Sequence, residues 1–205
     1  MRVFFISPGR TATTTLAQAF SSCVSWTSAH ESNTKKRYAD RCLYAQKHVE
    51  ADNRLVFFLP RLTELYAASE MLVIVRRDRK KIANSYRKRW WKFNLPKIYV
   101  FGILMRSFAE SEDELIDDMV DWIYDTIFYH AKNWNNVVVL DIEQPQEGFA
   151  KIFEYMQLSE AEAQKVKDNF SKNVMNENSY TLARTGHIFI HSLKNLIWDI
   201  NHGRR

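Results

Sequence analysis

The densest group of chemically capable residues follows the first apolar run of the sequence, Val3–Ile6. The next residues, Ser-Pro-Gly-Arg-Thr-Ala-Thr-Thr-Thr, combine one arginine with four threonines before a helical pattern begins. Backbone amides at a helix start bind anions, and hydroxyl and guanidinium groups add donors to phosphate oxygens. The stretch therefore predicts a strand, an anion-binding loop and a helix. A threonine-rich helix start without a ligand is the simpler alternative.

This loop differs from the loops that bind ATP or GTP. It lacks the Gly-Lys-Ser/Thr ending, in which the lysine contacts phosphate and one hydroxyl contacts magnesium. The apolar run Met71–Val75 ends in two arginines, and the run Val137–Leu140 with its following aspartate lies far along the chain. Magnesium chemistry is therefore not indicated, and we predict no metal site.

A second candidate phosphate site follows the run Met71–Val75. Arg76 and Arg77 come directly after it, and Ser85 lies early in the next helical pattern. An arginine at a strand end and a serine on the following helix can reach one point above a sheet. A cofactor with phosphate at both its 5′ and 3′ ends would use this site together with the first loop.

The elements that must position these residues alternate along the chain. Strand-like runs lie at 2–7, 24–29, 71–77 and 135–143, and helical patterns lie at 13–22, 60–70, 80–91, 112–133 and 145–158. Residues 34–51 are polar and helical in part, whereas 54–59 fit either a strand or the start of a helix. We predict one α/β domain over 1–205, with a parallel sheet of about four to five strands and helices on both faces. Ligands of such sheets bind at the carboxyl ends of the strands.

Charge and hydropathy narrow the partners and the compartment. The sequence has 29 Lys+Arg against 24 Asp+Glu, and nine of the basic residues fall within 76–92. This concentration favours one anionic site over a wide nucleic-acid surface, although a solvated basic helix gives the same pattern. The longest later apolar run, Ile98–Met105, is far shorter than the ~20 residues of a membrane span. With no secretory signal and two cysteines expected to be reduced, we expect a cytoplasmic protein without a membrane span.

Two motifs resemble those of a known family, the P-loop sulfotransferases. The stretch Gly-Arg-Thr-Ala-Thr-Thr-Thr-Leu-Ala (9–17) resembles the family's 5′-phosphosulfate loop, Gly-Arg-Ser-Gly-Thr-Thr-x-Leu-Ala. Residues 75–86 resemble its 3′-phosphate motif, with Arg77 and Ser85 at the family's spacing. Segments 49–60 and 137–159 also resemble small sulfotransferases, so the resemblance covers roughly residues 2–160 and implies the P-loop nucleotide-hydrolase-like fold of the sulfotransferase type.

The resemblance implies that 3′-phosphoadenosine-5′-phosphosulfate donates a sulfuryl group to a hydroxyl or amine, leaving 3′-phosphoadenosine-5′-phosphate without a metal. Arg10 would be catalytic, neutralising charge on the bridging oxygen as the bisphosphate leaves. An arginine in 184–186 would help to cover the cofactor, as a loose counterpart of the family's Arg-Lys-Gly segment. The implied cofactor-binding residues are Gly9, Arg10, Thr11, Ala12, Thr13, Thr14, Thr15, Arg77, Ser85 and Arg184.

The acceptor proton requires a base. Glu31 is the first candidate, because several sulfotransferase branches keep a glutamate at this place, and His30 is the second, because its ordinary pKa suits a base near neutrality. His48 and Glu50 form a weaker candidate pair that would face the acceptor. In the loop, Ala12 stands where the family has glycine, which costs about 1 kcal/mol if the position needs a positive φ.

Three alternatives to an active sulfotransferase remain open from the sequence. One is a small-molecule kinase, which the missing lysine disfavours. Another is a basic nucleic-acid-binding module, and a third is a catalytically degenerate sulfotransferase-like protein that binds nucleotide. We expect a small-molecule, carbohydrate or lipid acceptor and no nucleic acid, and the sequence does not separate these acceptor classes.

Overall fold

The computed structural model of the protein describes residues 1–88, 95–105 and 112–175. The described residues fall into two compact units. The first comprises Met1–Asp78 and Trp122–Met175, and the second contains Arg79–Asp121. The sheet, the predicted phosphate loop (residues 7–15) and both base candidates belong to the first unit.

The first unit is built on a five-stranded, all-parallel sheet, which confirms the predicted α/β class. The strand order is β2-β3-β1-β4-β5. Four of the strands had been predicted, whereas β3 lies in a segment expected to be polar and partly helical. The strands are β1 (Arg2–Ile6), β2 (Thr27–His30), β3 (His48–Ala51), β4 (Met71–Arg76) and β5 (Asn136–Asp141).

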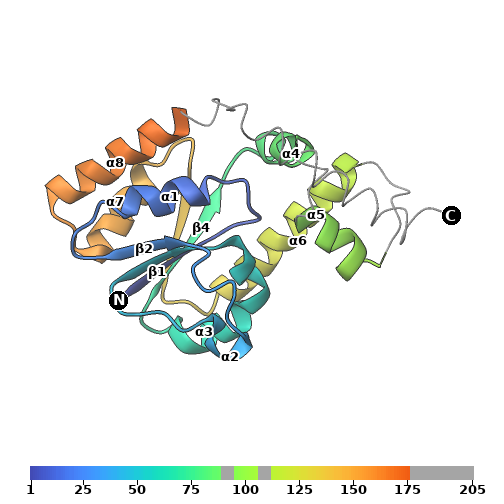
Figure 1. Ribbon diagram of the computed structural model, residues 1–205, viewed down its shortest axis with the longest axis horizontal. Helices are drawn as coiled ribbons and strands as arrows, with labels where there is room; N and C mark the ends of the chain where they lie inside the picture. Colours follow the sequence, from blue (N-terminus) through green and yellow to red (C-terminus); the bar gives the residue numbers. More distant parts are fainter. Residues whose placement is uncertain (89–94, 106–111, 176–205) are drawn as a thin grey trace. The chain divides into compact units, whose positions relative to one another are not determined.

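Helices cover both faces of the sheet (Figure 1). On one face lie α1 (Thr13–Phe20), α7 (Gln146–Met156) and α8 (Glu160–Met175). On the other lie α2 (Tyr38–Arg41), the 3₁₀ helix η1 (Asn53–Phe58) and α3 (Leu59–Tyr66). The long helix α6 (Glu112–Ala131) enters this unit at Trp122, and its Tyr124 hydroxyl donates to the Val75 carbonyl of β4 (3.1 Å).

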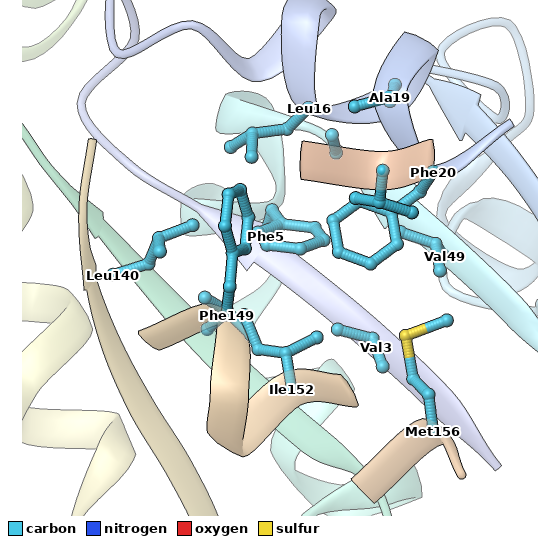
Figure 2. Close-up of a cluster of buried hydrophobic side chains, with 14 of the residues drawn as sticks. Val3, Phe5, Leu16, Ala19, Phe20, Val49, Leu140, Phe149, Ile152 and Met156 are labelled. Atoms are coloured by element: carbon cyan, nitrogen blue, oxygen red, sulfur yellow. The ribbon is translucent and has the colours of Figure 1, made fainter. Parts of the chain in front are cut away.

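The main core lies between the sheet and the helices α1, α7 and α8 (Figure 2). Phe5 of the central strand packs against Phe20 of α1 with ring centroids 5.3 Å apart, and Phe20 in turn contacts Phe149 of α7 (6.2 Å). Gly148 lets α7 approach β5 closely, since a Cβ there would lie 2.7 Å from Leu140 Cδ1. Continuous apolar strands are what a sheet buried on both faces requires.

The opposite face of the central strand carries an aromatic cluster. The ring of Phe4 contacts those of Tyr44, Tyr66 and Trp134, with centroids 5.4, 5.1 and 6.1 Å away. Because neighbouring strand residues point to opposite faces, Phe4 and Phe5 anchor β1 in both layers. The strand that precedes the predicted phosphate loop is therefore fixed from both sides.

The second unit holds part of the basic segment. It contains α4 (Arg79–Arg87), α5 (Leu95–Lys97), the π-helix η2 (Ile98–Ile103) and the start of α6. Arg79 pairs with Asp121 and Arg87 with Asp113, so acidic residues of α6 offset part of the positive charge. Within the described ranges, no helix has both the length and the hydropathy needed to cross a bilayer. Cys23 and Cys42 of the first unit are buried free thiols.

Candidate anion-binding site

The strand order places the predicted phosphate loop beside Arg77. β1 and β4 are adjacent in the sheet. The chain leaves β1 toward the edge strand β2 and leaves β4 toward the opposite edge strand, β5. Where connections of neighbouring parallel strands leave in opposite directions, a crevice forms at their carboxyl ends. The loop follows β1 and Arg77 follows β4, so both lie at this point of the sheet.

Three residues of the loop before α1 have left-handed backbone conformations. Gly9, Arg10 and Ala12 have positive φ values of 84°, 60° and 59°. Ala12 is the N-cap of α1 and makes no side-chain cap hydrogen bond. An alanine N-cap leaves the first amides of the helix without a side-chain acceptor, and left-handed residues next to a helix start turn successive N–H groups inward.

The loop hydroxyls divide into an inner and an outer set. Thr11 is fully buried, and its hydroxyl donates to Ser7 Oγ (2.6 Å), which also accepts from the Gly9 amide (3.1 Å). This bond braces the loop from inside. Thr14 is exposed, whereas Thr13 and Thr15 are largely buried.

Arg77 contacts the loop directly. Its Nη1 donates to the Arg10 carbonyl oxygen (2.8 Å). Its Nε is buried and, among the described residues, is the side-chain nitrogen or oxygen found without a hydrogen-bond partner. A buried charged donor with no acceptor is costly, which makes the position suited to an anionic ligand.

The two base candidates occupy different surroundings at the end of β2. His30 Nε2 lies 3.2 Å from Thr13 Oγ1 and 3.3 Å from Thr14 Oγ1, within hydrogen-bond distance of both. The carboxylate of Glu31 instead forms an ion pair with Arg54 of η1. His30 therefore lies against the phosphate loop, and Glu31 lies one residue further along the same turn.

His48 and Glu50, the weaker candidate pair, are buried inside the unit. Glu50 is 0% exposed and accepts hydrogen bonds from the Ser32 amide (2.9 Å) and hydroxyl (2.5 Å). Its Oε2 is also 3.0 Å from His48 Nε2, and His48 Nδ1 is 2.8 Å from Thr27 Oγ1. The pair therefore forms hydrogen bonds with Ser32 and Thr27 at the two ends of β2, and Glu50 does not face solvent.

Two other predicted residues are not part of the first unit as the structure describes it. Ser85 belongs to α4 of the second unit, and Arg184 lies outside the described residues. Sequence reasoning did not assign Ser32 or Arg54 to the site. β3 was not predicted because polar side chains interrupt its hydrophobic pattern. Its pairing with β2 brings Arg54, which follows β3, to the end of β2.

No protein-family model and no curated protein matches the sequence. The function is therefore argued from the two motifs and from the geometry around the loop. That geometry comprises a left-handed, uncapped helix entry, a buried arginine donor and a histidine beside two threonine hydroxyls. It suits an anion whose oxygens accept several hydrogen bonds, and within the described chain no cluster of His, Cys, Asp or Glu side chains is placed to hold a metal ion.

Proposed function

We propose that the protein is a sulfotransferase that moves a sulfuryl group from 3′-phosphoadenosine-5′-phosphosulfate to a hydroxyl or amine. The observation that carries the proposal is the contact of Arg77 with the phosphate loop and its buried, unpartnered Nε. An arginine at the end of the neighbouring strand and a Gly-Arg-Thr-rich loop are the two elements that the motifs require to meet. The missing loop lysine argues against a magnesium-dependent kinase.

The proposed reaction is an in-line displacement at sulfur. The acceptor oxygen or nitrogen forms a bond to sulfur as the bond from sulfur to the bridging oxygen breaks, and that oxygen keeps the electron pair. Arg10 and the first amides of α1 stabilise the charge that grows on the leaving bisphosphate. The acceptor proton passes to a base in the turn that follows β2.

His30 and Glu31 remain the two candidates for this base. His30 has the closer relation to the loop, because its ring nitrogen lies beside the Thr13 and Thr14 hydroxyls. Glu31 has a carboxylate that Arg54 holds in an ion pair. Transfer rates of His30→Asn and Glu31→Gln separate them, since removal of a general base lowers the rate by about 10²- to 10⁴-fold.

Calorimetry with 3′-phosphoadenosine-5′-phosphate in the presence of a chelator tests the proposal. The wild-type protein is expected to bind without metal, and Arg77→Ala is expected to weaken binding by about 10- to 100-fold, as for loss of hydrogen bonds to a charged group. Combining Arg77→Ala with Ser85→Ala is expected to abolish binding. Arg61→Ala is the matched control, because Arg61 pairs with Glu64 on α3 away from the loop.

Three outcomes would favour another function. If the wild-type protein does not bind 3′-phosphoadenosine-5′-phosphate, the sulfotransferase proposal is wrong. Binding of ATP that requires magnesium points to a kinase. Tight binding of 3′-phosphoadenosine-5′-phosphate with no transfer of labelled sulfate to any component of mixed extracts points to the degenerate module.

A further inference from the structure

The turn that carries both base candidates has an unfavourable backbone conformation. Glu31 has φ 54°, in the left-handed region that residues with a Cβ adopt at a cost. Such a conformation persists where surrounding contacts hold it, and it is enriched at functional sites. Thr34 donates to the Glu31 carbonyl oxygen from its amide (3.3 Å) and its hydroxyl (3.1 Å), and the long-range contacts of Glu31 and Ser32 come from residues 50–54 of β3 and η1.

The backbone of the turn is held on both sides of the Glu31 Cα atom. The Glu31 amide donates to the Ala51 carbonyl (3.2 Å), continuing the β2–β3 ladder. The next amide and hydroxyl, those of Ser32, both donate to the carboxylate of Glu50. Glu50 is fully buried and is itself oriented by His48, so this carboxylate is a fixed acceptor.

The side chain of the turn is held by the same segment. Arg54 pairs with the Glu31 carboxylate, and the Arg54 amide donates to Asp52 Oδ1 (2.8 Å). Asp52 also forms a buried ion pair with Arg41 of α2. The start of η1 is thus anchored in the unit while its arginine reaches the turn.

We propose that Glu50 is a positioning residue for the turn 30–32, acting through Ser32 to keep His30 against the loop threonines and Glu31 in its left-handed conformation. The proposal rests on the sulfotransferase function, because it concerns the base of that reaction. Without the two Ser32 hydrogen bonds, Glu31 relaxes to a right-handed or extended conformation, and both candidate side chains move. A shift of about 1 Å at a reacting group costs on the order of 10²-fold in rate.

The first test requires no acceptor. Amide hydrogen exchange of Ser32, followed by NMR, is expected to accelerate by about 10- to 100-fold in Glu50→Gln, because a bond to a charged acceptor is replaced by a weaker one. Glu70→Gln is the matched control. Glu70 is also a buried carboxylate, in the residue before β4, but it accepts from Arg2 Nη1 (2.8 Å) and the Tyr155 hydroxyl (3.2 Å).

The second test measures function in the same variants. Glu50→Gln is expected to lower the rate of sulfuryl transfer by about 10- to 100-fold, as for a misplaced reacting group, while the Kd of 3′-phosphoadenosine-5′-phosphate stays within about threefold. In the background of the base variant, whether His30→Asn or Glu31→Gln, adding Glu50→Gln is expected to cause no further loss. A merely structural role would give additive losses. Ser32→Ala, a change at an exposed residue, provides a milder second variant that keeps Glu50.

Two results would overturn the positioning role. One is a Ser32 amide in Glu50→Gln that exchanges as slowly as in the wild type. The other is a loss of transfer that Glu70→Gln reproduces in full. If the wild-type protein binds no 3′-phosphoadenosine-5′-phosphate, the proposed function fails, while the Ser32 exchange result still decides whether Glu50 holds the turn.

Discussion

Replacing Ala12 by glycine is expected to stabilise the protein. Ala12 is the N-cap of α1 and has φ 59° and ψ 29°, in the left-handed region. This conformation is unfavourable in free energy for a residue with a Cβ, because the Cβ approaches a backbone oxygen. Glycine has no Cβ and adopts it without this cost. The alanine side chain makes no capping hydrogen bond that the substitution would remove.

The expected gain is the difference between two opposing effects. The left-handed conformation costs alanine about 1–2 kcal/mol. Glycine offsets about 0.4–1 kcal/mol of this gain, because the unfolded protein has more conformations with glycine than with alanine at this position. Taking the middle of each range, about 1.5 and about 0.7 kcal/mol, the net increase in the free energy of unfolding is about 0.8 kcal/mol. For a chain of this size that raises the Tm by about 1–4 °C.

Thermal unfolding of the two proteins side by side measures this difference. The control is Ala150→Gly, which makes the same chemical change at an exposed position inside α7. A glycine in a right-handed helix interior is destabilising by about 1 kcal/mol, so its Tm should fall. If Ala12→Gly lowers the Tm as Ala150→Gly does, then residue 12 is not held at positive φ and the description of the loop is wrong.

Two further predictions concern the helices α7 and α8. Gly148→Ala is expected to destabilise the protein by about 1–3 kcal/mol in chemical denaturation, because the new methyl group meets Leu140 at its Cδ1 and 3.2 Å from its Cα; an unchanged denaturation midpoint would contradict the close approach of α7 to β5. Glu162 accepts from the Ser159 hydroxyl (2.9 Å) and amide (3.2 Å), and these bonds lower the pKa of its carboxyl. Because the folded pKa lies below the unfolded one, this contribution is complete above the unfolded pKa and is lost as the pH falls through the folded one. The stability difference between the wild type and Glu162→Gln should therefore shrink below about pH 4, and a difference that persists at pH 2 would refute the cause given.

Two of the central strands could be predicted because their continuous apolar residues are buried on both faces of the sheet. The runs at β1 and β4 are of this kind, and each was expected as a strand within two residues of its observed bounds. The strand β3 was not predicted because His48 and Glu50 interrupt its apolar pattern. Both are buried, and they are tolerated there because Ser32, Thr27 and each other satisfy their polar atoms.

The candidate site could be predicted in part. Motif spacing located the loop and Arg77, because both follow directly from strand ends whose neighbours a parallel sheet brings together. The contact of Arg77 with the Arg10 carbonyl and the hold of Glu50 on Ser32 depend on strand order and on side-chain packing between distant segments. The local sequence around these residues does not predict contacts between distant segments, so neither hydrogen bond was expected.

The strand order has a consequence for how the phosphate loop comes to exist during synthesis. The strand that carries the loop, β1, precedes in the chain both of the strands with which it pairs in the described sheet, β3 and β4. At about 5–20 residues per second, the chain must grow for several seconds before residue 76 completes the second neighbour. Pairing between strands so distant along the chain is also slow to form. The loop is thus synthesised before the two strands that fix its position in the sheet, and it can reach its folded position only after β4 has been made.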